Sequence, residues 1–243
     1  MKAAIISDIH SNLEALQAVL KDIKKRRIKK TFCLGDLVGY GANPNECVEL
    51  CMNEAEVVIA GNHDWATIKR TDVSVFNSVA AEAIRWTQKN ISKNNLKILK
   101  GLELTYTIPD SILLVHATPR NPAKWDYLFS LEEFEDEFRH FGPPVCFVGH
   151  SHIPGGVFQD ANGYTSFLRE NPFPLIKNRK FIVNVGSVGQ SRDLDPRASY
   201  AIYDGNDKSI EIIRLEYNIP LAQQKILDNG LPKILAERLL VGR

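Results

Sequence analysis

Five short apolar segments in the first two-thirds of the chain each run directly into side chains that commonly bind metals. The segments are residues 3–6, 31–34, 57–60, 112–115 and 145–148. Stretches with helical periodicity lie between them at 12–26, 44–52, 75–91 and 131–141. This alternation predicts β-α-β units. Because sites in open α/β sheets form beyond the carboxyl ends of the strands, we expect the polar residues there to meet in one crevice.

The residue types at these strand ends indicate a pair of divalent cations. The candidate ligands are Asp8, His10, Asp36, Asn62, His116, His150 and His152. Carboxylates, imidazoles and an amide suit Mn, Fe or Zn, whereas a structural zinc site would favour cysteines. Seven ligands exceed what one catalytic ion needs but fit two ions that share a carboxylate. Two ions about 3.5–4 Å apart can clamp the attacking and leaving oxygens of an in-line displacement, which is phosphoester chemistry.

Two pairs of these candidates have the same spacing. Asp8 and His10 are two residues apart, and so are His150 and His152. If the backbone stays extended, residues at this spacing project to the same side. Each pair can then reach one ion.

The rest of the chain changes character after about residue 153. Apolar segments at 155–158, 164–169, 180–183, 199–203 and 210–215 are separated by turn residues and predict a β-meander. Two helices are expected at 221–228 and 232–241. We expect residues 1–243 to form a single domain in which the helices of 221–241 cover an edge or face.

The segment 184–197 resembles a loop of the small bacterial and archaeal phosphodiesterase branch of the calcineurin-like metallophosphoesterases. The strand-end motifs together resemble those of the family as a whole. They are Asp-x-His at 8–10, Gly-Asp at 35–36, Gly-Asn-His-Asp at 61–64, His116, and Gly-His-Ser-His at 149–152. The resemblance implies an α/β fold, a four-layer α-β-β-α sandwich of two mixed β-sheets with flanking helices. It also implies two metal ions, with manganese favoured over iron, zinc, nickel or magnesium.

The resemblance further assigns a role to each motif residue. One ion would be held by Asp8, His10, Asp36 and His152, and the other by Asp36, Asn62, His116 and His150, with Asp36 bridging. A hydroxide shared by the two ions would attack the phosphorus. His63 would protonate the leaving group, and Asp64 is the candidate that orients His63.

The chain departs from the protein-phosphatase branch of this family in the segment after Asp36. Tyr40 replaces the arginine that grips phosphate in that branch, and Gly39 replaces the aspartate that supports its histidine. Serine/threonine phosphatase activity is therefore not expected. Other residues would have to bind the substrate phosphate, and the candidates are Arg120, Ser187, Arg192 and Arg197. For the segment 184–197, an ordinary glycine turn with solvated charges is an equally good interpretation.

The charge of the chain limits which classes of molecule it is expected to bind. The chain has 30 basic and 29 acidic residues, a formal net charge of +1, so no overall field favours nucleic acid or a membrane. We expect a small phosphorylated substrate, with a nucleotide or dinucleoside polyphosphate among the candidates. The alternatives are a nuclease, which needs a basic groove, and a non-catalytic scaffold, which would have lost ligands. The oligomeric state stays open.

The beginning of the chain and its cysteines bear on location. The first apolar segment is too short for a signal peptide, and no segment reaches the roughly 20 apolar residues that span a bilayer. The four cysteines form no Cys-x-x-Cys pair, which favours buried, reduced thiols. A cytoplasmic location is therefore expected.

Overall fold

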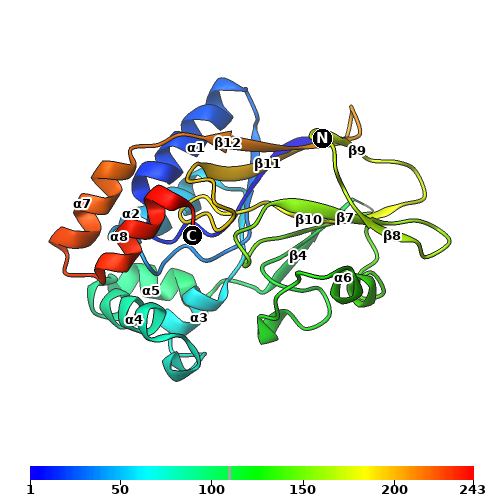
Figure 1. Cartoon of the computed structure of the whole chain (residues 1–243). Coiled ribbons are helices and arrows are strands. Elements are labelled where there is room, and N and C mark those ends of the chain that lie inside the picture. The colour runs from blue at the N-terminus through cyan, green and yellow to red at the C-terminus, as the bar shows by residue number, and fades with distance from the viewer. Residues whose placement is uncertain (109–110) are drawn as a thin grey trace.

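The computed structural model describes residues 1–108 and 111–243, which form two six-stranded β-sheets packed face to face with helices outside (Figure 1). The first sheet has the order β3-β2-β1-β11-β12-β9, and the second has the order β4-β5-β6-β10-β7-β8. Each sheet mixes parallel and antiparallel pairs. The predicted sandwich of two mixed sheets with flanking helices is confirmed.

The strands and helices have the following bounds. The first sheet contains β1 Lys2–Ile6, β2 Lys30–Cys33, β3 Val57–Val58, β9 Phe173–Pro174, β11 Ala198–Asp204 and β12 Ser209–Leu215. The second contains β4 Thr105–Ile108, β5 Ile112–Val115, β6 Val145–Val148, β7 Gly155–Gln159, β8 Thr165–Phe167 and β10 Lys180–Asn184. The helices are α1 Leu13–Lys25, α2 Pro44–Glu54, α3 Asn62–Thr67, α4 Ser78–Asn90, α5 Lys93–Lys100, α6 Leu131–Glu137, α7 Ile219–Asp228 and α8 Lys233–Val241.

Strand β1 shows how the sequence pattern produces the layers. Side chains alternate between the two faces of a strand. Ala3 and Ile5 therefore point into the core between the sheets, while Ala4 and Ile6 point into the core under the helices. All four are fully buried, which explains why β1 reads as a continuous apolar run.

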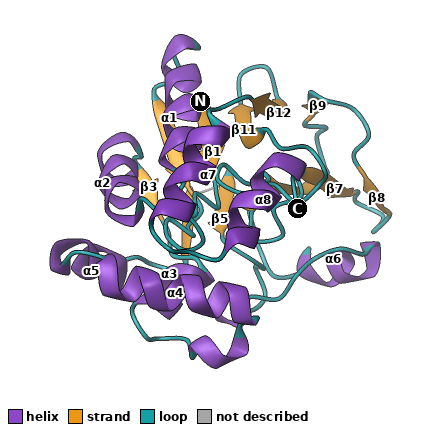
Figure 2. Cartoon of the chain, turned by 60° about the vertical axis from the view of Figure 1, so that its left-hand side comes forward, coloured by secondary structure: helices purple, strands orange, loops and turns teal. Residues whose placement is uncertain are grey.

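The outer layers are unequal. Helices α1, α2 and α5 bury apolar side chains such as Leu16, Val48 and Leu99 in the core that lies over the outer face of the first sheet. The second sheet is covered by α6, whose Phe134 packs with Val115. Figure 2 shows α6 apart from the other helices. The helical layer over the first sheet therefore contains more helices than the layer over the second sheet.

The last two helices form a separate cluster. Side chains of α7 and α8 pack with Tyr40 and with Ala83 of α4, and α7 also contacts α1. Figure 1 shows the end of α8 near the middle of the molecule, beside the loops that follow β10. These helices thus lie close to the ends of the central strands. The organisation of residues 1–243 as a single domain stays a prediction.

The predicted meander is wrong. Strands β7 and β8 form a hairpin at the edge of the second sheet, where β7 also pairs with β10. Strands β11 and β12 form a hairpin in the first sheet, where β11 pairs with β1. Turn residues predict where a hairpin forms. They do not predict which sheet the hairpin joins, because that depends on which core its apolar side chains enter.

Several short elements were also missed. They are α3, α5, β4 and β9. Strand β3 ends at Val58 instead of residue 60, because the Ala60 amide donates to the Glu103 carbonyl outside the ladder. None of the helices in the part of the chain that the structure describes combines the length and apolar character that crossing a bilayer requires.

The core between the sheets should dominate stability. Phe147 is fully buried there and meets the Tyr203 ring edge to face, with 6.2 Å between ring centroids. Phe147→Ala should lower the free energy of unfolding by about 3–5 kcal/mol, because the cavity adds to the lost burial. Urea unfolding would measure the change. The matched control is Phe129→Ala, at a side chain that is 58% exposed, which should cost about 0.5 kcal/mol. Equal losses would contradict this account of the core.

Candidate metal centre and substrate cleft

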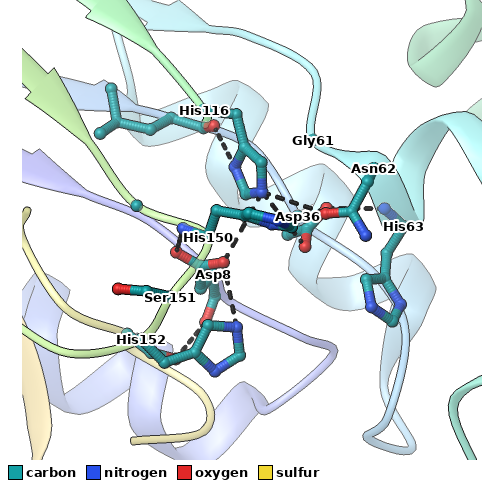
Figure 3. Close-up of polar contacts among 12 residues, drawn as sticks. Asp8, Asp36, Gly61, Asn62, His63, His116, His150, Ser151 and His152 are labelled. Carbon is teal, nitrogen blue, oxygen red and sulfur yellow. Dashed lines mark hydrogen bonds and ion pairs between the residues drawn. The ribbon is translucent and has the colours of Figure 1, made fainter. Parts of the chain in front are cut away.

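The structure gathers all seven candidate ligands at one point. Figure 3 labels six of them, namely Asp8, Asp36, Asn62, His116, His150 and His152. Each follows the end of a strand: β1, β2, β3, β5 or β6. All seven side chains are buried, and Asn62, the most exposed of them, is at 7%. His10 and His152 are 142 residues apart in the sequence, yet their Nε2 atoms are 3.0 Å apart. The predicted convergence of strand ends is what the structure shows.

One group of ligand atoms surrounds Asp8. Its Oδ1 lies 3.2 Å from Nε2 of His152 and 3.7 Å from Nε2 of His10. Oδ2 of Asp36 lies 3.6 Å from the same His10 nitrogen. Asp8, His10 and His152 thus place one ligand atom each within the reach of a single cation.

A second group surrounds His116. Its Nε2 lies 3.4 Å from Oδ2 of Asp36 and 3.2 Å from Oδ1 of Asn62. Asp36, His116 and His150 also have ligand atoms within the reach of a single cation. Because Asp36 Oδ2 lies close to His10 and to His116, this carboxylate stands between the two groups.

Backbone carbonyls orient the four histidines. Each ring donates one N–H to a carbonyl oxygen: His10 to Val38, His116 to Leu34, His150 to Trp125 and His152 to Gln190. In a neutral ring the other nitrogen is then a lone pair that faces the centre, as in metal-binding histidines. The facing Nε2 atoms of His10 and His152 are therefore both acceptors. Asp8 Oδ1 is buried beside them without a hydrogen-bond partner.

This donor set fits divalent cations. Buried acceptors that face one another at hydrogen-bond distance, without a proton between them, are costly unless a positive charge lies there. A carboxylate, imidazole lone pairs and an amide oxygen are the donors that Mn, Fe and Zn accept. The residues present can hold the metal that this geometry requires.

The protonation states agree with this arrangement. Burial acts to raise the pKa of Asp8 and of Asp36, but the facing imidazoles outweigh it and hold both pKa values well below the usual range. Burial lowers the pKa of His150 to about 4 and that of His152 to about 3. These rings are therefore neutral at pH 7, as ligands must be.

The side chains of the two residue pairs reach the centre, but not through the extended backbone that the spacing predicted. Asp8, His10, His150 and His152 are not in extended backbone, since their φ angles lie between 48° and 65°. Asp36 shares this left-handed conformation, with φ 51°. Non-glycine residues adopt it at a cost of order 1–3 kcal/mol each, and such residues cluster at functional sites. The sharp local turns, and not a flat strand, aim these side chains at the centre.

Two glycines make room for the carboxylates. The amide of His150 donates to Asp8 Oδ2 at 3.0 Å, and the amide of His63 donates to Asp36 Oδ1 at 2.8 Å. A Cβ at Gly149 would collide with the Asp8 carboxylate, and one at Gly61 would collide with that of Asp36. The glycines of the Gly-His-Ser-His and Gly-Asn-His-Asp motifs are thus required by close approach.

The Asp64 carboxylate bonds to backbone amides. Its carboxylate oxygens accept hydrogen bonds from the amides of Leu37, Val38 and Gly61, at 3.0, 3.4 and 2.9 Å. Asp64 therefore holds the turn after β2 against the start of α3. The described structure shows no hydrogen bond between Asp64 and the His63 ring, whose Nδ1 has no partner.

His63 lies at the border between the centre and the open cleft. Its ring packs against those of His10, Tyr40 and Phe76, with centroids 4.9, 4.5 and 5.1 Å away. Its Nδ1 is buried without a partner and faces Gly39, at the position where the protein-phosphatase branch has an aspartate. Burial holds the pKa of His63 well below its usual range.

A cleft of about 540 Å³ opens beside His63 and His150. Of the four predicted substrate-binding residues, Arg192 lies in it. The guanidinium of Arg192 donates to the Tyr40 hydroxyl and to Gln190 Oε1, both at 3.2 Å. Arg192 thus lies beside Tyr40, the residue that replaces the phosphate-binding arginine of the protein-phosphatase branch.

The other three predicted substrate-binding residues, Arg120, Ser187 and Arg197, do not line the described cleft. Arg120 pairs with Asp136 on the surface, and Arg197 forms a bidentate pair with Asp195 outside the cleft. Ser187 is fully buried, and its hydroxyl donates to the Asp8 carbonyl at 2.8 Å while accepting from the Gln190 amide. Ser187 therefore holds the loop that carries Asp8.

The sequence interpretation missed most of the cleft wall. It includes Phe76, Lys124, Trp125, Tyr127, Arg238 and Arg243. The Tyr127 ring stacks on that of His150, with centroids 4.1 Å apart and planes 19° apart. The aromatic cluster at 125–129 in an otherwise polar loop was a signal of this wall, since exposed aromatics in loops often mark binding sites. Nothing local distinguishes Arg238 from other helix-surface arginines.

Comparisons with known proteins agree with the geometry. The sequence profile of the calcineurin-like phosphoesterase superfamily domain matches residues 1–208. An uncharacterized protein of Methanocaldococcus jannaschii is 48% identical over 245 residues, covering 99% of this chain and 98% of that protein.

Solved structures show the same fold. The crystal structure of a metallophosphoesterase from Sphaerobacter thermophilus superposes with a TM-score of 0.86 at 38% identity, covering 100% of this chain and 99% of the other. A hypothetical protein of Pyrococcus horikoshii OT3 superposes with a TM-score of 0.80 at 19% identity, covering 100% and 98%.

The metal-free protein should lose stability above neutral pH. Burial disfavours the charged His116 ring, but Asp36 and Asp8 outweigh burial and raise the pKa of His116 from 6.5 to about 9. A raised pKa contributes stability that is complete below pH 6.5 and is lost as pH rises through 9. In EDTA, the free energy of unfolding should fall by about 2 kcal/mol between pH 7 and pH 9. Urea unfolding would measure this, and the same fall in His116→Gln would contradict the assignment.

Proposed function

Because the chain belongs to the calcineurin-like phosphoesterase superfamily, and is therefore a hydrolase of phosphoesters, we propose that it works with two divalent metal ions on a small phosphorylated substrate. The observation that carries this proposal is the set of facing, unprotonated acceptors at the strand ends. His10 Nε2, His152 Nε2 and the unpartnered Asp8 Oδ1 converge within 3.0–3.7 Å. Such a cluster is stable around a cation and not without one.

The seven buried residues divide into two ligand sets. Asp8, His10 and His152 would hold one ion, and Asn62, His116 and His150 would hold the other, with Asp36 common to both. Manganese is our first choice among the divalent metals, because the set mixes carboxylate, amide and imidazole and contains no thiolate. When bound, such ions activate water and neutralise the phosphate oxygens.

The residues of the chain supply position and proton transfer. His63 lines the cleft next to Asn62, and its ring position is fixed by the packing of Tyr40 and Phe76. We assign His63 the protonation of the leaving oxygen. With its Nδ1 unpaired, His63 lacks the carboxylate support found in the protein-phosphatase branch. A bound substrate phosphate would raise the pKa of the ring, so that His63 would take up a proton from water and could then give it to the leaving oxygen.

The cleft suits a small molecule. Its volume of about 540 Å³ lies within the range of small-molecule sites, and its wall combines aromatic rings with basic groups. A nucleotide or a dinucleoside polyphosphate is chemically compatible with both. A non-catalytic scaffold is the less favoured function, because all seven ligands are present and converge. We also propose a cytoplasmic location, because the four cysteines are free and buried.

Removal of the shared carboxylate tests metal-dependent catalysis. Asp36→Ala should abolish hydrolysis of bis(p-nitrophenyl) phosphate in the presence of Mn, with kcat falling at least about 1,000-fold, because both ions lose a ligand. Metal content measured on the same preparations should fall as well. Asp228→Ala, on the surface of α7, is the control and should behave as the unsubstituted protein. Unchanged turnover in Asp36→Ala would contradict the two-metal mechanism.

Replacement of His63 tests the assignment of the proton donor. His63→Ala should keep its metals and lose turnover mainly on esters with poor leaving groups, by about 100-fold or more, since a good leaving group needs no proton. Turnover of methyl and p-nitrophenyl esters would be compared. His140, the histidine outside the motifs, is exposed, and His140→Ala is the matched control. An equal loss on both esters would remove His63 from this role.

Salt dependence separates a small-molecule enzyme from a nuclease. A nuclease loses affinity steeply as salt rises, because its contacts with the phosphate backbone release counterions. DNA and RNA should remain uncut in the assay that hydrolyses the small diester.

A further inference from the structure

Three arginines from distant parts of the chain line the cleft. Arg192 lies in the loop between β10 and β11, Arg238 lies on α8, and Arg243 follows that helix. Their side chains meet beside the metal centre only because the end of α8 packs against the loop that carries Arg192. The Leu194 amide donates to the Gly242 carbonyl at 2.9 Å, and this bond fixes the two segments together.

The charges of these arginines are not neutralised by the chain. Within residues 1–108 and 111–243, no carboxylate lies within 4.0 Å of the charged groups of Arg192, Arg238 or Arg243. By contrast, Arg197 and Arg214 in the same region pair with Asp195 and Asp193. The described cleft wall contains a fourth cation, Lys124, and no acidic residue. For a protein with a net charge of +1, this is a strong local concentration of positive charge.

Burial makes this concentration costly. The Nε of Arg238 is buried without a hydrogen-bond partner in the described structure. Burial and the neighbouring charge of Arg192 both lower the pKa of Arg238. Unpaired, partly desolvated guanidinium groups that repel one another are stabilised by an anion that accepts from both. The arrangement is therefore that of an anion site.

The site extends outward from the metal centre in a fixed order. The Tyr40 ring packs against His10, a candidate ligand, with centroids 4.6 Å apart. The guanidinium of Arg192 lies 5.7 Å from the centroid of the same Tyr40 ring. Arg192 is close enough to the centre for its charge to act on Asp8 and His152. Arg238 is in turn a charged neighbour of Arg192, and with Arg243 it lines the part of the cleft formed by the end of α8.

We infer that Arg192, Arg238 and Arg243 bind a phosphate group beyond the one that is cleaved, so that the preferred substrate carries two or more phosphates in series. The inference rests on the proposed function for the position of the cleaved phosphate. It does not depend on that function for the anion site itself. Guanidinium groups suit this task because their planar donors match phosphate oxygens.

The segment that provides two of these arginines lies outside the matched family domain. The domain match ends at residue 208, whereas α8 covers Lys233–Val241. The ligands and His63 all lie within the matched part. The metal chemistry thus belongs to the shared domain, and selection of the substrate belongs in part to the last helix.

Direct binding tests the anion site without relying on catalysis. Isothermal titration of the purified protein with inorganic tripolyphosphate should show at least about tenfold tighter binding than with orthophosphate, because several charge-assisted contacts add. The titration is repeated after dialysis against EDTA, which separates binding from chelation of metal by tripolyphosphate. The Arg238→Ala/Arg243→Ala double variant should lose at least about tenfold in tripolyphosphate affinity and much less in orthophosphate affinity.

Two further variants control for the loss of a positive charge in general and for poor folding. Arg197→Ala removes an arginine that is paired outside the cleft and should leave tripolyphosphate affinity unchanged. Arg238→Lys keeps the charge and the stem, so it should restore part of the affinity if the alanine variant folds poorly. Equal affinity of the unsubstituted protein for the two anions, or unchanged tripolyphosphate binding in the double variant, would overturn the inference.

Kinetics then link the site to the substrate. The ratio of kcat/KM for diadenosine tetraphosphate to kcat/KM for bis(p-nitrophenyl) phosphate should fall at least about tenfold in the double variant, and stay constant in Arg197→Ala. An unchanged ratio would show that the arginines do not select the substrate. If no ester is hydrolysed while arginine-dependent binding of tripolyphosphate persists, the proposed function fails and the anion site stands.

Discussion

The structure depends on a cluster of buried acceptors that cannot satisfy one another. Each histidine of the centre gives one N–H to a backbone carbonyl, so each neutral ring turns a lone pair toward Asp8 and Asp36, and without metal the His116 ring carries a second proton until the pH rises to about 9. Carboxylates and lone pairs at 3.0–3.7 Å repel in a medium without water. The arrangement is therefore stabilised by a cation. The left-handed backbone conformations that bring the groups together after the strands are strained.

The sandwich explains why such a cluster can be held. Strand β1 is buried on both faces and is paired on both edges, with β2 and with β11. Its end can move only if both cores move with it. The carbonyls that fix the histidine rings belong to equally constrained segments, such as Leu34 after β2 and Gln190 after β10. The packing of the two sheets thus keeps the seven candidate ligands in fixed positions.

The sequence predicted the parts of the site that depend on local pattern. Apolar runs that end in Asp, His or Asn identify strand ends, and the topology of α/β sheets then brings those ends together. The sequence did not predict that the side chains of Asp64 and Ser187 bond to the backbone, because adjacency in sequence does not give the direction of a side chain. Arg238 was missed because its place depends on how α8 packs, which no local pattern encodes. The same reason explains the wrong meander, since hairpins β7–β8 and β11–β12 look alike in sequence but join different sheets.

The pairing of β1 with β11 sets the order in which the molecule can be assembled. Residues 2–5 find their partners at 201–204, close to two hundred positions later in synthesis. The loop at 187–189 that braces Asp8 is also made late. A nascent chain therefore carries Asp8, His10 and Asp36 for most of its translation without the strand that locks them, and contacts of such long range form slowly. Completion of the catalytic pocket is consequently a late event in biogenesis, after nearly the whole polypeptide has left the ribosome.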